Sequence, residues 1–540
     1  MPGFRAMNRW TLFLVRMLSQ EKRWLTLRLV CSFIWAAELF WVQGLAFDTE
    51  PWVRYPLLVQ FIRFCLDWVT TLLLSLLLQR RFVTPLLLVN AILLVVVGTY
   101  SIYFHRPLMP VGIVFRWHEG CSVRSYLGVM IPLRILAVIL VTLSAKFLLL
   151  IGSGRGNIPA WARWRMALFA VILYALLVGV LQWTQFKLSA TGDMGRAIYA
   201  YGYTLPWFFD SLGSLNQGDL AERATAFSER HHHDRLTPME RPLSIGASVL
   251  VLQLETIGTR VLDASCVGGA VMPFMQELRR KSLYYRIQSF HSNGSCDMDF
   301  AATTFTRPYP CAVPYRLPGM QYTNSIPGFM KQHGYRTYVF HGNTQLFYDR
   351  GVMMEQLGFD QIFFKEQLAS RHLKTSIMGV RDADLLRCVA EVMGSEKFVY
   401  VFAITLDTHA PFNVISESEM DIFPRPESQV EKYLNSARYL DNCLRDLIEK
   451  VPVGTTVVLY GDHTASLNTE ILRSDVVEGV EYVPCLIYQK GNDLSHFQTT
   501  RDQDCSRDGS LDVLDIMGYL RNSVMASDDI RRRGAPPSPR

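Results

Sequence analysis

The first third of the chain contains five long hydrophobic runs, whereas the remainder alternates short hydrophobic runs with amphipathic stretches. A hydrocarbon core about 30 Å thick is crossed by about 20 helical residues, so each long run is sufficient to span a membrane. The pattern therefore predicts a multi-pass α-helical membrane domain over residues 1–186. The five spans are expected at 25–46, 55–79, 82–104, 127–151 and 166–186.

The distribution of Lys and Arg between these runs predicts the orientation of the domain. Basic residues are concentrated in the N-terminal segment (Arg5, Arg9, Arg16, Lys22, Arg23 and Arg28), the second connection (Arg80 and Arg81) and the fourth (Arg155, Arg163 and Arg165). The alternate connections carry only Arg54, Arg106, Arg116 and Arg124. Because basic connections stay in the cytoplasm, the N-terminus is expected to be cytoplasmic. An odd number of spans then places everything after about residue 186 on the outer side.

Three smaller features lie in or beside these runs. Arg63 and Asp67 lie four apart in the second run and so share a helix face, where they either line a path through the membrane or neutralise each other inside the bundle. Residues 187–243 mix aromatic and polar residues and predict an interfacial linker, in which histidines 231–233 belong to a solvated loop. The Arg- and Pro-rich residues 526–540 predict a disordered tail.

Residues 244–525 have the pattern of an α/β domain. Short continuous hydrophobic runs that alternate with helical periodicity indicate a largely parallel sheet covered on both faces. Strands are expected at 248–254, 336–340, 398–405, 455–460 and 482–488, and helices at about 272–281, 325–332, 382–393, 431–448 and 511–523.

Acidic and imidazole side chains directly follow four of the predicted strands, where ligands bind in sheets of this kind. They are Glu255, His341, Asp407 with His409, and Asp462 with His463. Glu255, Asp462 and His463 would suit a divalent cation such as Mn²⁺, Mg²⁺ or Zn²⁺. A hydroxyl group bound to such an ion is deprotonated readily, and Ser295 in the polar loop 290–300 is a candidate for this nucleophile.

Composition narrows the class of protein further. The net charge of +6 comes from 54 basic and 48 acidic residues without a basic block, so nucleic acid is not an expected partner. The ten cysteines include no C-x-x-C pair, which argues against zinc ribbons, thioredoxin-like sites and a dense disulfide scaffold.

Five motifs in this region resemble those of the lipoteichoic acid synthase-like, sulfatase-related membrane phosphotransferases of the alkaline phosphatase superfamily. They run in the family's order over about 280 residues, and the segment from His341 to Arg350 is the most specific. The resemblance implies an alkaline phosphatase/sulfatase-like catalytic domain on the outer side of the membrane. The motifs are residues 254–256, 297–300, 341–350, 405–412 and 460–463.

The resemblance also implies a role for each motif residue. Glu255, Ser295, Asp462 and His463 would hold one divalent metal, Mn²⁺ in the first instance, with Mg²⁺ or Zn²⁺ as alternatives. Ser295 aligns with the family's nucleophilic threonine and would form a covalent phospho-enzyme. His341, Tyr348, Arg350 and His409 match positions around the transferred group, where Arg350 would grip phosphate oxygens and His409 would donate a proton.

The implied activity is transfer of a phosphoglycerol group from a phospholipid, phosphatidylglycerol, to an extracytoplasmic glycan or glycerol-phosphate acceptor. The alternatives are a phosphoethanolamine transferase that modifies an envelope glycan, and an inactive scaffold of a polysaccharide machine. The expected location is a bacterial inner membrane, with the catalytic domain on the extracytoplasmic, periplasmic side.

The sequence departs from the family pattern at several positions. Serine replaces threonine in a loop about three residues shorter than expected, so the alignment alternatively places Cys296 at the nucleophile. Cys296 lacks the C-x-P-x-R context of a sulfatase, which argues against sulfatase activity. Tyr348 replaces the usual tryptophan, and no histidine follows Asp462-His463 at the position typical of phosphoethanolamine transferases, which favours phosphoglycerol. In an oxidising compartment, Cys296 and Cys311 would be able to form a disulfide, whereas Cys485 is expected in the core.

Overall fold

The structure is a computed structural model that describes residues 25–42, 57–77, 80–104, 133–152, 160–183, 222, 224–227, 242–245, 248–266, 269–309, 313–317, 322, 324–410, 412–465, 467, 476–477, 480–498 and 511–534. The chain divides into two compact units. The first unit holds Met1–Val114 and Ser125–Leu215, and the second holds Phe115–Arg124 and Asn216–Arg540. Most of the 187–243 linker lies outside the described residues, and histidines 231–233 lie wholly outside them. Cys311 also lies outside them, so the disulfide between Cys296 and Cys311 stays a prediction.

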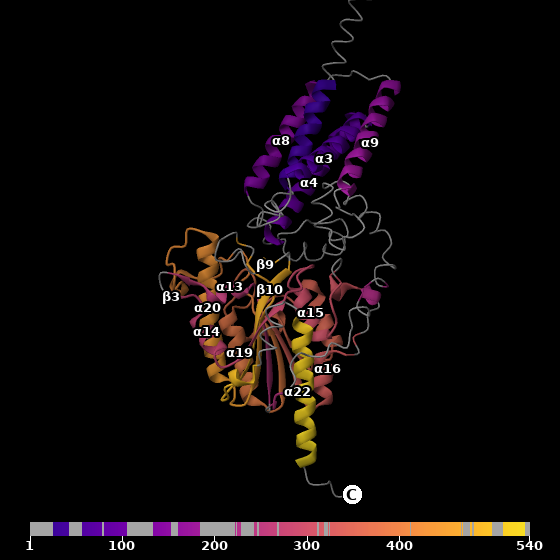
Figure 1. Cartoon of the computed structure of the whole chain (residues 1–540). Helices are drawn as coiled ribbons and strands as arrows, with labels where there is room; N and C mark the ends of the chain where they lie inside the picture. The colour runs from indigo at the N-terminus through magenta and orange to yellow at the C-terminus, as the bar shows by residue number, and fades with distance from the viewer. Residues whose placement is uncertain are drawn as a thin grey trace, which may run out of the picture. The chain divides into compact units, whose positions relative to one another are not determined.

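The first unit contains a helix in each of the five predicted hydrophobic segments. They are Leu25–Val42, α3 (Leu57–Leu77), α4 (Arg80–Phe104), α8 (Leu133–Gly152) and α9 (Ala160–Trp183) (Figure 1). Two described segments, Leu25–Val42 and Phe82–Thr99, are long and apolar enough to cross a membrane by length and composition. Ile135–Leu149 and Trp164–Gly179 are shorter apolar stretches. Five membrane spans therefore remain a prediction, although the helices occupy the expected places.

Several charged side chains are buried inside the first unit. Arg63 and Asp67 are both buried, as expected for charges that face the bundle, and the Arg63 guanidinium lies 4.4 Å from the centre of the Phe40 ring. The structure also pairs Lys146 on α8 with Glu38, which the hydrophobic pattern did not reveal. Both members of this ion pair are fully buried, so removal of either side chain would leave an uncompensated buried charge.

The second unit is built on one mixed sheet that contains a parallel core. The strand order is β4-β10-β8-β1-β7-β5-β6, with β9 paired to β10. The pairs from β8 through β1, β7 and β5 to β6 are parallel, whereas β10 is antiparallel to β8, β4 and β9. The strands are β1 (Val249–Leu254), β4 (Leu283–Gln288), β5 (Arg336–His341), β6 (Gln361–Phe363), β7 (Val399–Ile404), β8 (Thr456–Gly461), β9 (Val476–Val477) and β10 (Val480–Gln489). A separate hairpin is formed by β2 (Ser265–Cys266) and β3 (Gly269–Ala270).

All five predicted strands are present, and the largely parallel α/β domain is confirmed. The prediction missed β4, β6 and β9 of this sheet and the separate β2–β3 hairpin, and it did not distinguish the antiparallel β10 from its parallel neighbours. In β4, buried and half-buried residues alternate, because this strand pairs with β10 at one end of the strand order. Its hydrophobic signal is consequently weaker than that of β1, in which every residue is buried.

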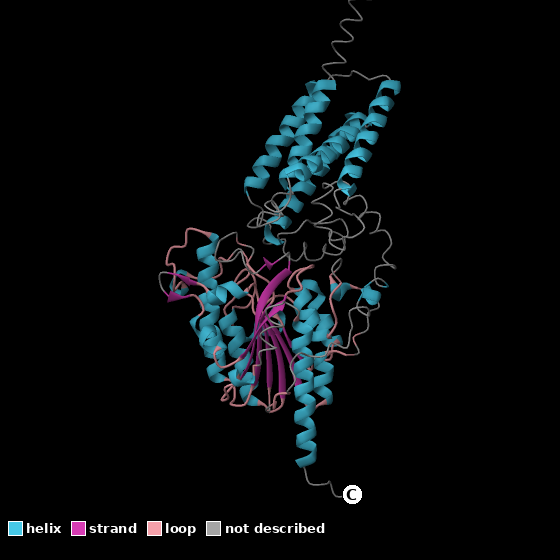
Figure 2. Ribbon diagram, in the orientation of Figure 1, coloured by secondary structure: helices cyan, strands magenta, loops and turns pink. Residues whose placement is uncertain are grey.

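Helices cover both faces of the sheet, as Figure 2 shows. Alternate residues of β1 belong to two separate hydrophobic cores, with Val249 and Val251 in one and Leu250 and Leu252 in the other. A strand buried on both sides has no polar face, which explains its continuous apolar run. The helices are α13 (Thr259–Asp263), α14 (Pro273–Arg279), α15 (Cys296–Thr304), α16 (Ile326–Gln332), α17 (Arg350–Gln356), α18 (Lys365–Leu368), α19 (Asp382–Ser395), α20 (Gln429–Lys450) and α22 (Val513–Gly534).

The C-terminal helix α22 extends further than the sequence pattern suggested. Residues 526–534 belong to this helix although residues 526–540 were expected to be disordered, and residues 535–540 lie outside the described part of the chain. The hydroxyl groups of Ser523 and Ser527 accept hydrogen bonds from the backbone N–H groups of Leu243 and Ile245. These contacts join segments more than 250 residues apart, so no local sequence pattern predicts them.

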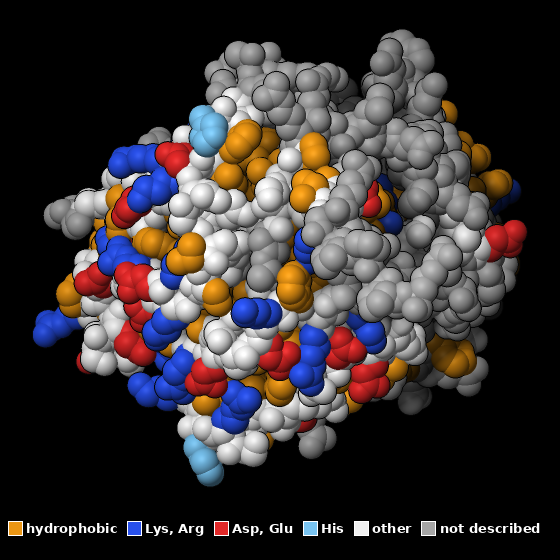
Figure 3. Space-filling view, turned by 90° about the horizontal axis from the view of Figure 1, so that it is seen from below, with side chains coloured by type: hydrophobic (Ala, Val, Ile, Leu, Met, Phe, Trp, Pro, Cys, Tyr) orange, Lys and Arg blue, Asp and Glu red, His pale blue; other side chains and the backbone are white. Residues whose placement is uncertain are grey.

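The surface of the described part is mixed in charge where it is seen from below. Figure 3 shows Lys and Arg side chains interspersed with Asp and Glu side chains, with hydrophobic side chains scattered between them. The coloured side chains on this face therefore form no large patch of one charge sign.

Candidate active site

The predicted site residues lie at the carboxyl ends of neighbouring strands. Glu255 follows β1 directly, and Asp462 and His463 follow β8, which pairs with β1. On the other side of β1, His409 follows β7, and His341 is the last residue of β5. The parallel register thus brings residues more than 200 positions apart to one edge of the sheet.

Glu255, Asp462 and His463 form a group that is able to hold a metal ion. One ligand atom from each lies within 4.8 Å of the others. The Nε2 atom of His463 is 3.1 Å from the Oε1 atom of Glu255 and 3.8 Å from the Oδ1 atom of Asp462. Two carboxylates and an imidazole are ordinary ligands for Mn²⁺, Mg²⁺ or Zn²⁺.

The three side chains of this group shift one another's pKa values strongly. Burial and the charge of Glu255 raise the pKa of Asp462 well above its ordinary value. Burial also acts to raise the pKa of Glu255, but the hydrogen bond from His463 and the charges of His409 and His463 outweigh it and lower that pKa. Although burial disfavours its charge, His463 has a pKa raised to about 10 by Asp462 and Glu255. Among the described residues, the Oδ2 atom of Asp462 has no hydrogen-bond partner, so the donor set fits a cation at this position.

Tight packing of the backbone brings the ends of β1 and β8 together. A Cβ atom on Gly461 would lie 1.8 Å from the carbonyl oxygen of Ile257, so only glycine allows this approach. Thr256 has a left-handed backbone, with φ of 55°, and its N–H donates to the Oδ1 atom of Asp462. Its hydroxyl donates to the Oε1 atom of Glu255. Thr256 thereby orients both carboxylates of the metal-binding group.

Ser295 lies next to β1, at the N-terminal end of α15. The side chain of Gln253, near the end of β1, donates to the carbonyl oxygen of Ser295 across 3.2 Å. Asp297 stabilises the preceding loop because its carboxylate accepts from the backbone and side-chain amides of Asn293. Ser295 is half-buried, whereas the neighbouring Cys296 is fully buried in α15. This difference favours Ser295 over Cys296 as the nucleophile, a role that remains a prediction.

Tyr348 and Arg350 lie close to the same loop. Gly294 has a φ of 108°, and a Cβ atom at that position would lie 2.4 Å from the hydroxyl of Tyr348. The Arg350 guanidinium lies 5.0 Å from the centre of the Tyr348 ring. These contacts join the 341–350 motif to the residue that precedes Ser295.

Arg350 is held by a buried carboxylate that the sequence analysis did not assign. Its Nε atom donates to the Oδ2 atom of Asp299 across 2.5 Å, and both side chains are almost fully buried. Burial raises the pKa of Asp299 to about 6 even though Arg350 opposes the rise. The Nη2 atom of Arg350 has no hydrogen-bond partner among the described residues. This part of the guanidinium is therefore available to an oxyanion.

The two remaining histidines are anchored by backbone carbonyl groups. The Nδ1 atom of His341 donates to the carbonyl oxygen of Ile404, and its Nε2 atom is without a partner among the described residues. Burial, reinforced by the charge of Arg350, lowers the pKa of His341 to about 3, so this imidazole is neutral. The Nδ1 atom of His409 donates to the carbonyl oxygen of Ala410 across 2.6 Å. Both rings thus have a defined tautomer and a second nitrogen for other contacts.

Asp407 follows a strand like the other candidates, but its carboxylate is used in a hydrogen-bond network that stabilises the fold. Its carboxylate accepts from the Nε atom of Arg381 and the backbone N–H of Asp382. In return, the carboxylate of Asp382 accepts from the backbone N–H groups of Leu406 and Asp407. This reciprocal network secures the loop that carries His409.

Comparison with known proteins identifies the domain that contains this site. Residues 247–514 match the Sulfatase family model. This part of the chain therefore resembles a Sulfatase-family domain. The chain is 24% identical over 261 residues to lipoteichoic acid synthase from Staphylococcus saprophyticus, which covers 46% of this chain and 40% of that protein. It is 26% identical over 231 residues to lipoteichoic acid synthase 2 from Bacillus subtilis, with 40% and 35% covered.

The predicted resemblance to lipoteichoic acid synthase-like proteins of the alkaline phosphatase superfamily is thus confirmed. The matched region spans about two-fifths of the length of these curated relatives. In fold, the chain resembles integral membrane lipooligosaccharide phosphoethanolamine transferase A from Neisseria meningitidis, with a TM-score of 0.54 and 12% identity. That likeness covers 90% of this chain and 92% of the other, so it extends beyond the Sulfatase-family domain into the N-terminal helices.

Proposed function

We propose that this protein is a metal-dependent phosphotransferase that moves a phosphoglycerol group from phosphatidylglycerol to an extracytoplasmic glycan or glycerol-phosphate acceptor. The observation that carries the proposal is the meeting of Glu255, Asp462 and His463 at the ends of β1 and β8. Gln253 of β1 also holds the carbonyl oxygen of Ser295. The relatives, which are lipoteichoic acid synthases, support a phosphotransferase in the sulfatase fold.

In this proposal Glu255, Asp462 and His463 hold one divalent ion, Mn²⁺ in the first instance, and the Ser295 hydroxyl is its fourth protein ligand. When bound, such an ion lowers the pKa of the hydroxyl and stabilises negative charge on the phosphoryl oxygens. The two buried carboxylates and the partnerless Oδ2 atom of Asp462 support a cation here.

The transfer takes place in two displacements. The Oγ atom of Ser295 loses its proton to water and attacks phosphorus, the bond from phosphorus to the diacylglycerol oxygen breaks, and the leaving oxygen takes a proton from the protonated ring of His409. An acceptor hydroxyl then gives its proton to His409 and attacks the same phosphorus, and the serine oxygen leaves as the alkoxide. Arg350 binds a phosphoryl oxygen through its Nη2 atom, while His341 and Tyr348 surround the group.

The proposed location is a bacterial inner membrane, with the catalytic domain on the extracytoplasmic side. The apolar helices of the first unit and the uneven distribution of basic residues support this orientation. The phosphate of a lipid donor stays at the bilayer surface. A membrane anchor would therefore keep the catalytic domain close to its substrate.

Release of diacylglycerol tests the proposal directly. The purified full-length chain in detergent is incubated with Mn²⁺ and fluorescent phosphatidylglycerol, and the expected products are diacylglycerol and a phosphorylated protein. Ser295→Ala should abolish both, whereas Ser292→Ala in the same loop should retain them. Equal release by Ser295→Ala would refute the nucleophile. Preferential use of phosphatidylethanolamine in competition would replace the proposed donor with the phosphoethanolamine alternative.

A further inference from the structure

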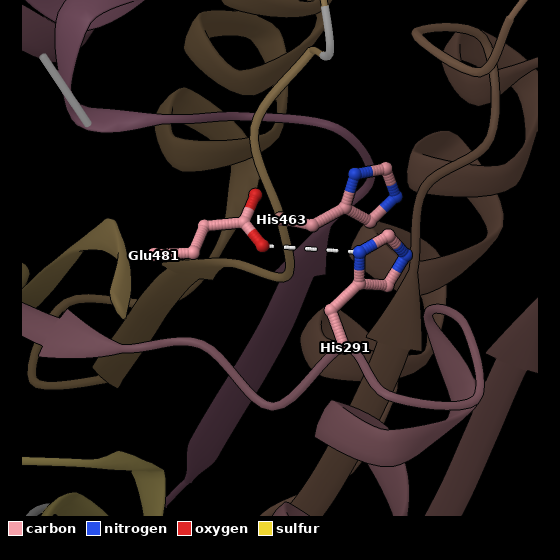
Figure 4. A group of neighbouring side chains, drawn as sticks. All are labelled: His291, His463 and Glu481. Carbon is pink, nitrogen blue, oxygen red and sulfur yellow. Dashed lines mark ion pairs between the residues drawn. The ribbon is translucent and has the colours of Figure 1, made fainter. Parts of the chain in front are cut away.

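His291 and Glu481 lie against His463 but have no part in the transfer proposed above. His291 follows β4, Glu481 lies near the start of β10, and His463 follows β8. Figure 4 shows the three side chains converging, with one potential ligand atom from each within 4.8 Å of the others. The rings of His291 and His463 are stacked in parallel, with centres 3.9 Å apart and an angle of 6° between their planes.

Glu481 connects the two histidines through Thr464. One oxygen of its carboxylate accepts from the backbone N–H of Thr464 at 2.5 Å and from the Thr464 hydroxyl at 2.7 Å. The other oxygen faces the Nδ1 atom of His291 at 3.8 Å. The Nδ1 atom of His463 in turn lies 2.9 Å from the carbonyl oxygen of Thr464. The four residues therefore form a closed circuit of contacts around the His463 ring.

This circuit determines which nitrogen of His463 faces the metal site. A carbonyl oxygen only accepts hydrogen bonds, so the Nδ1 atom of His463 must carry the proton. In the neutral ring that binds a metal, the Nε2 atom is then the nitrogen with the lone pair, and it points at Glu255. In Figure 4 the second nitrogen of each histidine lies on the side away from Glu481.

We propose that His291 and Glu481 are positioning residues that, together with Thr464, fix the ring plane and the tautomer of His463 for metal binding. This inference rests on the metal site of the proposed function. The stacked ring of His291 restricts rotation of His463 from one face, and Glu481 secures the backbone that receives the Nδ1 proton. Groups of this kind typically contribute 10–100-fold to metal affinity.

A second metal ion shared by the two histidines fits the geometry less well. The nitrogen lone pairs of two stacked parallel rings lie in two separate parallel planes, whereas two ligands of one ion must converge on it. The Nδ1 and Nε2 atoms of His463 also already face Thr464 and Glu255. The experiment below nevertheless distinguishes the two arrangements.

The test measures metal affinity without substrate. The full-length chain is freed of metal with a chelator and titrated with Mn²⁺ against a fluorescent competing chelator, which gives both the Kd and the stoichiometry. His291→Ala and Glu481→Ala should each raise the Kd 10–100-fold. His291→Phe keeps a stacking ring but has no nitrogen, so it should bind Mn²⁺ within about threefold of the wild type. One ion per chain is expected in every case.

His333→Ala is the matched control. Like His291, His333 contacts one aromatic ring, that of Phe329, and one carboxylate, that of Asp528. The His333→Ala variant should leave the Kd for Mn²⁺ unchanged. An unchanged Kd in His291→Ala, or equal weakening by His291→Phe and His291→Ala, would overturn the positioning role. Two ions in the wild type and one in His291→Phe would show ligation instead. A wild type that binds no Mn²⁺ would refute the metal dependence of the proposed function itself.

Discussion

Replacement of Gly294 by alanine tests how the nucleophile loop and the 341–350 motif fit together. The added Cβ would lie 2.4 Å from the Tyr348 hydroxyl, about 1 Å closer than an ordinary contact. A left-handed backbone costs a non-glycine residue about 1–2 kcal/mol, and overpacking of this kind costs about 1–3 kcal/mol. The sum of about 2–5 kcal/mol predicts a Tm lower by roughly 5–15 °C in a domain of this size.

The same displacement should also reduce catalysis. A shift of about 1 Å in a group that positions the reaction costs up to about 100-fold in rate, so diacylglycerol release by Gly294→Ala should fall by roughly that factor. Tyr348→Phe removes the hydroxyl that the new methyl group meets. The double variant should therefore recover about 1–3 kcal/mol of stability.

Gly334 supplies the control for backbone strain. It has a φ of 82°, and a Cβ atom there would meet nothing within 4 Å. Gly334→Ala should therefore show only the cost of the left-handed backbone, about 1–2 kcal/mol. The reasoning is wrong if Gly294→Ala is no more destabilising than Gly334→Ala, or if Tyr348→Phe fails to restore any stability.

Three further predictions follow from the same structure. Asp441→Ala removes the carboxylate that accepts hydrogen bonds from two backbone N–H groups at the start of α14, so the free energy of unfolding measured by calorimetry should fall by about 2–4 kcal/mol. Asp446 is exposed, and Asp446→Ala should leave the free energy of unfolding unchanged. Equal Tm values for the two variants would contradict this prediction. Burial disfavours the charge of Asp360, but its hydrogen bonds and the charge of Lys331 lower its pKa. The stabilisation that the Asp360 carboxylate provides is therefore present above about pH 4 and lost below it. The Tm values of the wild type and Asp360→Asn should differ at pH 7 and converge as the pH falls. Chelation should lower the Tm of the second unit, and Mn²⁺ at 100 times its Kd should restore about 2.7 kcal/mol; a Tm insensitive to both would argue against the metal site.

The candidate site was accessible from the sequence because its residues follow hydrophobic strands. The strand before Glu255 and the one before Asp462 are buried on both faces, so each is recognisable as a continuous apolar run that ends in a charged residue. Parallel pairing then requires the ends of such strands to meet. His341 and His409 were identified by the same reasoning, with the family resemblance as a second source.

Other members of the site became visible only in three dimensions. Asp299 is one of several acidic residues in its segment, and only the fold shows that it holds Arg350. His291 lies in the loop that carries Ser295, while Glu481 lies 190 residues later, and neither has a local signal that pairs it with His463. Contacts at such separations depend on strand order and register, which hydrophobic periodicity does not specify.

The sequence by itself determined the helical N-terminal region, the α/β class, the resemblance to a family and the principal motif residues. These features depend on local periodicity and on short motifs, both of which are contained in neighbouring residues. The tertiary structure decided the antiparallel placement of β10 and β4, the extension of α22 and the contacts that orient each candidate site residue. These depend on which segments pack together, a property that arises only when the whole chain folds.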